Sequence, residues 1–307
     1  MKKDILTHLS GTEKLSILLV LVLFSTIVIG GLGLIAAHLI TNLSLGDSIL
    51  LDFNHPRTIL YLKIMQIFQA IGLFIAPPII AVFSFQEKDE DYLQFRKTNI
   101  ILIFLSALLI VSALPIINWL AEINQALILP ESWSGIEQWM RDSEAAAGQI
   151  TSSFLKADNV STLFLNLFVM ALIPAFGEEM LFRGVLQKLF IQISKNTHLG
   201  IWITAFIFSA IHMQFFTFLP RFFMGAMFGY MLVWSGSIWL TITAHFINNG
   251  TAVIINYLVQ KGSVDSTIES VGSESISLFI LSTLLVFSGM YFIKTSEKKL
   301  NLKRHHK

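Results

Sequence analysis

Length, composition and charge limit the classes of protein to which this chain can belong. It has 307 residues, 54% of them hydrophobic and 13% charged, with a formal net charge of +1. Soluble domains carry about a quarter of charged residues, so this chain has too few polar side chains to cover a water-facing surface. The near-neutral charge gives no indication of a nucleic-acid partner. The absence of cysteine excludes disulfides, thiolate metal sites and a cysteine nucleophile.

Long apolar runs predict an all-α, polytopic membrane bundle of about eight transmembrane helices. The first run, of about 25 residues, is longer than the apolar core of a signal peptide and is interpreted as an uncleaved span. We expect the fifth and sixth spans to be separated at Pro220, and the GxxxG pair Gly225 and Gly229 to mark close helix packing. The expected spans are 15–40, 58–84, 98–121, 160–185, 199–219, 221–235, 237–260 and 275–294.

The distribution of Lys and Arg predicts the orientation of the bundle. With the N-terminus inside, the inner segments hold fifteen basic residues and the outer segments five, while Lys63 completes the total of 21. This is a positive-inside bias. We therefore expect both termini to be cytoplasmic, and the protein to be a multi-pass protein of a bacterial cytoplasmic membrane.

The one sizeable segment outside the expected spans is 122–159. It carries six acidic and two basic residues, and its Trp133, Trp139 and Met140 indicate a helix lying at the membrane interface. Two roles remain open for it at this point, namely a simple connector and a lid or docking element for a substrate.

Two adjacent carboxylates stand in the middle of the fourth span. Of the 20 acidic residues, 18 fall in tails, loops or span edges, which leaves Glu178 and Glu179 at membrane depth. A buried carboxylate costs several kcal/mol unless it is protonated, paired or solvated. Ionisable residues at this depth are therefore candidates for a functional site.

Helix geometry separates the two glutamates. Arg183 follows Glu179 by four residues and lies on the same face, so the two can form an ion pair. Glu178 is turned by about 100° from Glu179 and has no charged neighbour on its helix. We expect Arg183 to hold Glu179 while Glu178 works as an acid or base. The alternative is a charge cluster that only locks helices together.

Histidines within two further spans add to this group. Phe208 and His212 share a face of the fifth span, and His245 and Asn249 share a face of the seventh. A lone membrane histidine is often a packing residue. Two imidazoles, a carboxamide and a carboxylate on separate helices indicate a polar site able to hold a water molecule.

Other hydrolytic schemes lack their residues. The chain contains no HExxH, no GxSxG and no aspartate within a span, so a zincin site, a serine nucleophile of the hydrolase type and an aspartyl dyad are excluded. Glutamate, histidine and asparagine remain.

At these residues the sequence resembles the CAAX-protease and bacteriocin-processing (CPBP, or Abi) family of intramembrane proteases, which includes Rce1-type prenyl endopeptidases. The family motifs EExxxR, FxxxH and HxxxN stand in order at Glu178–Arg183, Phe208–His212 and His245–Asn249. The resemblance implies three regions: 1–159 with three spans and the acidic connector, 160–260 as the catalytic core, and 261–307 with the last span and a basic cytoplasmic tail.

The resemblance also implies a role for each residue. Glu178 would be the general base for a water that His212 also holds, and His245 and Asn249 would stabilise the oxyanion. Arg183 would orient the acidic pair of Glu178 and Glu179. The protein would then be an endopeptidase that cleaves a membrane-associated or lipidated peptide or protein from the cytoplasmic side.

Metal dependence and two other functions are kept as alternatives. We favour a mechanism without a cofactor, while zinc bound by Glu178, His212 and His245 is the alternative. A non-catalytic scaffold or bacteriocin self-immunity protein of the same fold is the second function. A proton-coupled transporter is the third, although the chain lacks an inverted repeat. The expected partners are membrane lipids and a membrane-associated substrate.

Overall fold

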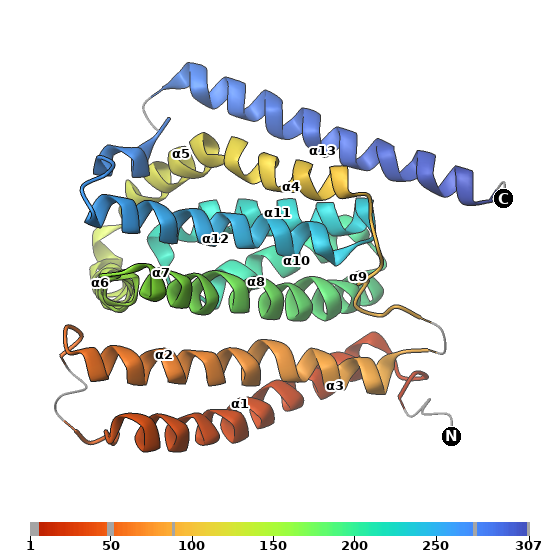
Figure 1. The fold of residues 1–307 in the computed structure, drawn as a ribbon. Coiled ribbons are helices and arrows are strands. Elements are labelled where there is room, and N and C mark those ends of the chain that lie inside the picture. The colour runs from red at the N-terminus through yellow and green to blue at the C-terminus, as the bar shows by residue number, and fades with distance from the viewer. Residues whose placement is uncertain (1–5, 48–51, 88–89, 273–274, 306–307) are drawn as a thin grey trace.

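A computed structural model describes residues 6–47, 52–87, 90–272 and 275–305, with the side chains of 269–270 and 297–305 left out. Throughout these ranges the chain forms helices and turns and no strand, so the expected all-α bundle is confirmed. The helices lie side by side along one common direction (Figure 1). The expected basic tail is described as backbone alone, and Lys2, Lys3, Lys88 and Lys307 lie outside the described residues.

The helices follow one another along the chain with few long connections. In order they are α1 (Gly11–Thr41), α2 (Pro56–Ala70), η2 (Ile71–Ile75), α3 (Ala76–Phe85), α4 (Ile100–Ser112), α5 (Leu114–Gln125), η3 (Glu131–Trp133), α6 (Ser134–Leu155), α7 (Val160–Asn166), η4 (Leu167–Leu172), α8 (Ile173–Glu178), η5 (Glu179–Leu186), α9 (Gln187–Ser194), α10 (Thr197–Ala210), η6 (Phe215–Thr217), α11 (Phe218–Ser235), α12 (Ile238–Gln260), η7 (Ser266–Ser270) and α13 (Ile276–His305).

The chain is an integral, multi-pass membrane protein. All eight apolar segments expected to be spans are helical. Six stretches of the described chain are long and apolar enough to cross a membrane, and the bent pair of α4 and α5 makes a seventh. The fifth expected span differs, because α10 has 14 residues and ends at Ala210. The hydropathy of 199–219 does not reveal this early end.

The break after α10 lies before Pro220 rather than at it. Met213 adopts a left-handed backbone conformation with φ 53°, which is uncommon for a residue with a side chain, and the chain turns there. Pro220 instead lies in the first turn of α11, where its missing N–H leaves no hydrogen bond unmade. The prediction of a break at Pro220 was therefore wrong by several residues.

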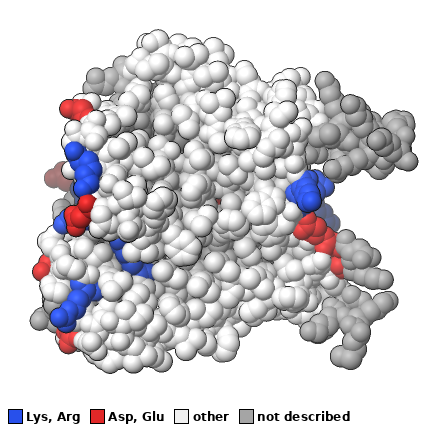
Figure 2. Space-filling model, in the orientation of Figure 1, with Lys and Arg blue, Asp and Glu red and all other residues white. Residues whose placement is uncertain are grey.

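The two ends of the bundle differ. One end, called here the terminal end, holds the first described residues, the turn between α9 and α10, and the end of α13. The opposite end, called the α6 end, holds α6 and η6 (Figure 1). Charged side chains gather at both ends of the face in Figure 2, and an uncharged belt lies between them. This arrangement suits a bundle whose long axis crosses the membrane.

Helices α10 and α11 pack closely through the GxxxG pair. A Cβ atom on Gly229 would lie 2.8 Å from Ile201 Cγ2 and 2.6 Å from Gln187 Oε1, and one on Gly225 would lie 3.2 Å from the Cα atom of Ala205. Real Cβ atoms do not approach other atoms as closely as the Gly229 position would require. The expectation that these glycines serve helix packing is confirmed.

We predict that Gly229→Leu lowers the free energy of unfolding by about 1–3 kcal/mol, because the added side chain overpacks the contact with α10. Thermal unfolding of the purified protein in detergent measures the effect. Gly30→Leu is the matched control, since a Cβ at Gly30 in α1 meets no atom within 4 Å. Equal melting temperatures for the two variants would contradict the packing role of Gly229.

Candidate active site

The centre of the bundle holds a buried ion pair. Arg183 Nη1 lies 2.9 Å from Glu179 Oε1, and neither side chain has any exposed surface. Arg183 Nη2 also donates to the carbonyl oxygen of Gly225 in α11, at 3.3 Å. The pair predicted from the spacing of four residues is thus present, although this part of the chain is the π-helix η5. Glu179 is therefore the counter-ion of Arg183.

Three phenyl rings surround the guanidinium of Arg183. Its central carbon lies 4.4 Å from the ring centre of Phe208, 5.3 Å from that of Phe228 and 6.0 Å from that of Phe182. The negative faces of aromatic rings attract a cation, most strongly where water is excluded. The phenylalanine of the FxxxH motif is therefore a partner of the arginine of the EExxxR motif.

His245 joins the ion pair from α12. Its Nδ1 lies 2.9 Å from Glu179 Oε1, and its ring stacks on Phe228 with a centroid distance of 5.7 Å. Glu179 is paired with Arg183, so its carboxylate accepts and His245 Nδ1 donates. This bond fixes the ring and leaves Nε2 facing Glu178.

Glu178 differs from its neighbour. Its Oε2 lies 3.8 Å from His245 Nε2, and it makes no hydrogen bond to any other described residue. It is 9% exposed, whereas Glu179 is fully buried. Two adjacent carboxylates thus have different partners, one held by Arg183 and His245 and the other free to bind a water or a substrate.

His212 and Asn249 lie at the border of this group. His212 Nδ1 donates to the carbonyl oxygen of Phe208 at 2.7 Å, so its Nε2 is the acceptor in the neutral ring. Asn249 Nδ2 donates to the carbonyl oxygen of Met170 in η4 at 3.3 Å, and Asn249 Oδ1 lies 3.0 Å from Asn248 Nδ2. Both side chains are half-buried. His212 is thus linked to the ion pair through Phe208, whose ring lies against Arg183. Asn249 lies one turn after His245 on α12.

Arg221, at the start of α11, is a site residue that the sequence interpretation missed. Its charge acts electrostatically on Glu178 and His212. Its Nη2 donates to Gln214 Oε1 at 2.5 Å, and its Nη1 is buried without a partner among the described residues. The sequence signal was a single arginine at the edge of an apolar run. From the sequence it was included only among the five basic residues of the outer segments.

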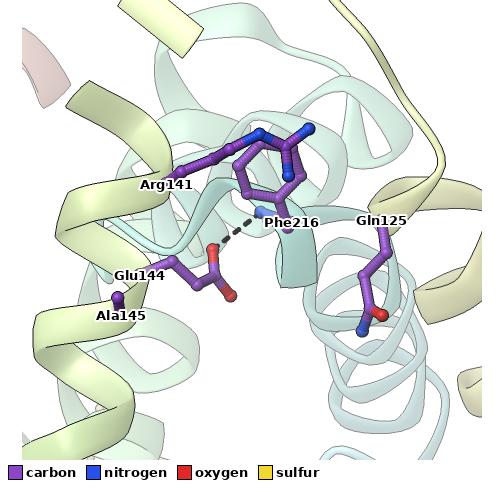
Figure 3. A pocket seen from close by; sticks show the side chains of 5 residues that line it. All are labelled: Gln125, Arg141, Glu144, Ala145 and Phe216. Carbon is purple, nitrogen blue, oxygen red and sulfur yellow. Dashed lines mark hydrogen bonds between the residues drawn. The ribbon is translucent and has the colours of Figure 1, made fainter. Parts of the chain in front are cut away.

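Helix α6 covers the chain between His212 and Arg221. Glu144 accepts hydrogen bonds from the Phe216 amide at 2.8 Å and from the Thr217 hydroxyl at 3.2 Å. The guanidinium of Arg141 lies 4.4 Å from the ring centre of Phe216. A cavity of about 410 Å³ opens beside these contacts, lined by Gln125, Arg141, Glu144, Ala145 and Phe216 (Figure 3). The expected helix in 122–159 is present as α6. It contacts the stretch of chain that lies between His212 and Arg221.

The fit of a metal ion can be tested on the donors. Among the described residues, no group of three or more His, Asp or Glu side chains is placed to hold a metal. The Glu179 carboxylate accepts from His245 Nδ1 and the Phe208 carbonyl accepts from His212 Nδ1, so Nε2 of each ring stays available. Metal-bound histidines show the same outer hydrogen bonds, and zinc therefore stays the alternative to a mechanism without metal.

Known proteins are similar to the part of the chain that carries these residues. Residues 160–251 match the family model for type II CAAX prenyl endopeptidase, Rce1-like. This region is similar to the Rce1-like family. All three motifs lie inside it, so the resemblance expected from them is confirmed.

A Bacillus subtilis (strain 168) protein, the uncharacterized protein YpbD, is 37% identical over 86 residues. These residues make up 27% of this chain and 41% of that protein, so the match spans about two fifths of that relative's length. No solved structure matches the chain.

We predict that Glu179→Gln destabilises the protein by about 3–5 kcal/mol, because it leaves a buried guanidinium without its counter-ion. Glu178→Gln is the matched variant, one residue away, and should change the free energy of unfolding by much less, because Glu178 makes no ion pair with an arginine. Thermal unfolding in detergent compares the two. Equal losses would show that the structure assigns the pair wrongly.

Proposed function

We propose that the protein is an intramembrane endopeptidase in which Glu178 activates the water that hydrolyses a peptide bond. The observation that carries this proposal is the unequal partnership of the two glutamates. A structural cluster needs one carboxylate for one arginine, and Glu179 fills that role at 2.9 Å. Glu178 makes no ion pair with an arginine, is 9% exposed and lies 3.8 Å from the His245 imidazole.

In the proposed reaction, a water lies between Glu178 and the substrate carbonyl. Glu178 takes a proton from this water as its oxygen forms a bond to the carbonyl carbon. Collapse of the tetrahedral intermediate breaks the C–N bond, and Glu178 returns the proton to the leaving amine. The free acceptor Nε2 of His212 is suited to hold the second hydrogen of the water.

Stabilisation of the oxyanion falls to His245 and Asn249. With Nδ1 donating to the Glu179 carboxylate, His245 donates from Nε2 only when the ring carries both protons. Donors fixed in this way need little rearrangement as negative charge develops.

We place the approach to this site at the α6 end. At the terminal end the segment before α4 packs against the start of α12: Tyr92 and Leu93 are buried, the Ile238 amide donates to the Gln94 carbonyl at 2.9 Å, and Trp239 Nε1 donates to the Phe95 carbonyl at 3.1 Å. At the other end α10 stops at Ala210, and His212 is half-buried in the connection that follows it.

This approach conflicts with one implication of the resemblance. The positive-inside bias predicts cytoplasmic termini, and the α6 end is opposite the termini (Figure 1). Together these favour an entrance on the outer face of the membrane, whereas the resemblance implied cleavage from the cytoplasmic side. We propose the outer face, in a bacterial cytoplasmic membrane, with a membrane-associated peptide or protein as substrate.

The predicted catalytic role is tested with Glu178→Gln. Purified protein and a panel of quenched hydrophobic peptides, lipidated and unlipidated, should give cleavage that the variant reduces by roughly 10²- to 10⁴-fold. Glu122→Gln, an exposed glutamate of α5, is the control and should retain the wild-type rate. Cleavage should also persist after treatment with a metal chelator. Full activity of Glu178→Gln would contradict the proposal, and loss on chelation with recovery on adding zinc would overturn the mechanism without metal.

The predicted side of the entrance can be measured with single cysteines, since the chain has none of its own. Gly148→Cys in α6 and Lys97→Cys before α4 place exposed thiols at opposite ends. A membrane-impermeant maleimide added to intact cells should label Gly148→Cys and not Lys97→Cys. The reverse pattern would place the α6 end, and with it the entrance, in the cytoplasm.

A further inference from the structure

The site contains two guanidinium groups, and they differ in the partners that they contact. Arg183 pairs with Glu179, donates to a backbone carbonyl and lies among three aromatic rings. Arg221 makes no ion pair with any described residue, and its Nη2 donates to the neutral amide oxygen of Gln214. Of these two cations, Arg183 has a carboxylate partner in the fold, whereas Arg221 has none among the described residues.

The carboxylates near Arg221 do not neutralise it by contact. Its charge interacts with Glu178 on the side of the site and with Glu144 on the side of α6. Glu144 is bonded to the backbone amide of Phe216 and the hydroxyl of Thr217, and Glu178 faces His245. A buried guanidinium N–H without an acceptor is costly, and an arriving anion removes that cost.

The start of α11, which carries Arg221, is held by two neighbouring helices. Ser209 Oγ donates to the Phe218 carbonyl at 2.7 Å, which ties the end of α10 to the start of α11. Asn124 of α5 accepts from the Leu219 amide at 2.7 Å and donates to the Phe215 carbonyl at 2.9 Å. Arg221 therefore stands in the first turn of an anchored helix, with its Nη2 bonded to Gln214, rather than on a free loop.

We infer that Arg221, oriented by Gln214, binds a carboxylate of the substrate on the α6 side of the scissile bond. The planar fork of arginine matches a carboxylate, and Nη1 together with the remaining N–H groups is available to it. The carboxylate is either the C-terminus of the peptide or an acidic side chain near the cleaved bond. This inference rests on the proposed function, because it assigns a ligand to the same site.

The test separates binding from cleavage. Three dansyl-labelled versions of one hydrophobic hexapeptide are used: a C-terminal acid, a C-terminal amide, and an amide with one internal glutamate. Their affinities are measured by fluorescence on the full-length protein carrying Glu178→Gln, so that no peptide is consumed. We expect the free acid to bind about tenfold to a hundredfold more tightly than the plain amide.

Variants assign that preference to Arg221. Adding Arg221→Gln should abolish the difference between acid and amide, and Arg221→Lys should keep part of it by retaining the charge without the fork. Arg141→Gln is the matched control: it removes an arginine from the same end, one that is already paired with Glu137 at 2.6 Å, and the preference should remain. Melting temperatures confirm that each variant is folded.

Each outcome decides the matter. Tight binding of the amide with the internal glutamate, lost in Arg221→Gln, identifies an acidic side chain as the source. Equal binding of acid and amide, or a preference that persists in both Arg221 variants, overturns the inference. A preference that Arg221→Gln removes, in a protein that cleaves none of the peptides, would instead retain the anion subsite and reject the protease.

Discussion

The buried pair of Arg183 and Glu179 is the interaction on which the rest of the site depends. A charge at membrane depth is tolerated when a counter-ion and hydrogen bonds replace water, and this guanidinium has a carboxylate, a backbone carbonyl and three aromatic rings. These partners come from η5, α10 and α11, so the pair also fixes how three helices meet.

The carboxylate of Glu179 also fixes a side chain of α12. Glu179 Oε1 accepts from His245 Nδ1, so the ring cannot turn freely and its Nε2 faces Glu178. The phenyl ring of Phe208 lies against Arg183, and its carbonyl oxygen receives His212 Nδ1. Residues from three separate motifs are thus linked into one group, and Glu178 remains outside the links with its carboxylate available for chemistry.

Local sequence patterns predicted the parts of this arrangement that depend on one helix. The separation of Glu179 and Arg183 by four residues anticipated their ion pair, and the apolar runs anticipated the helical segments, because both signals are local. The early end of α10 was missed because hydropathy continues to 219 while the backbone turns at Met213.

Contacts between distant segments could not be predicted in this way. The bond from Glu179 to His245 joins residues 66 positions apart, and the packing at the terminal end joins Gln94 to Ile238. Arg221 was missed for a related reason, since its significance comes from the carboxylates across the site rather than from its own neighbours. The positions of His212, His245 and Asn249 in apolar spans suggested that they share one polar site, and the resemblance to a family supplied the role expected of each.

The central claim is that Arg183 belongs to Glu179 and not to Glu178. A double-mutant cycle on the free energy of unfolding tests it, with Glu179→Gln, Arg183→Met and their combination compared with the same cycle on Glu178→Gln. The structure predicts a coupling of about 1–3 kcal/mol for Glu179 with Arg183 and near-additivity, within about 0.5 kcal/mol, for Glu178 with Arg183. Equal coupling in the two cycles, or none in the first, would contradict the account.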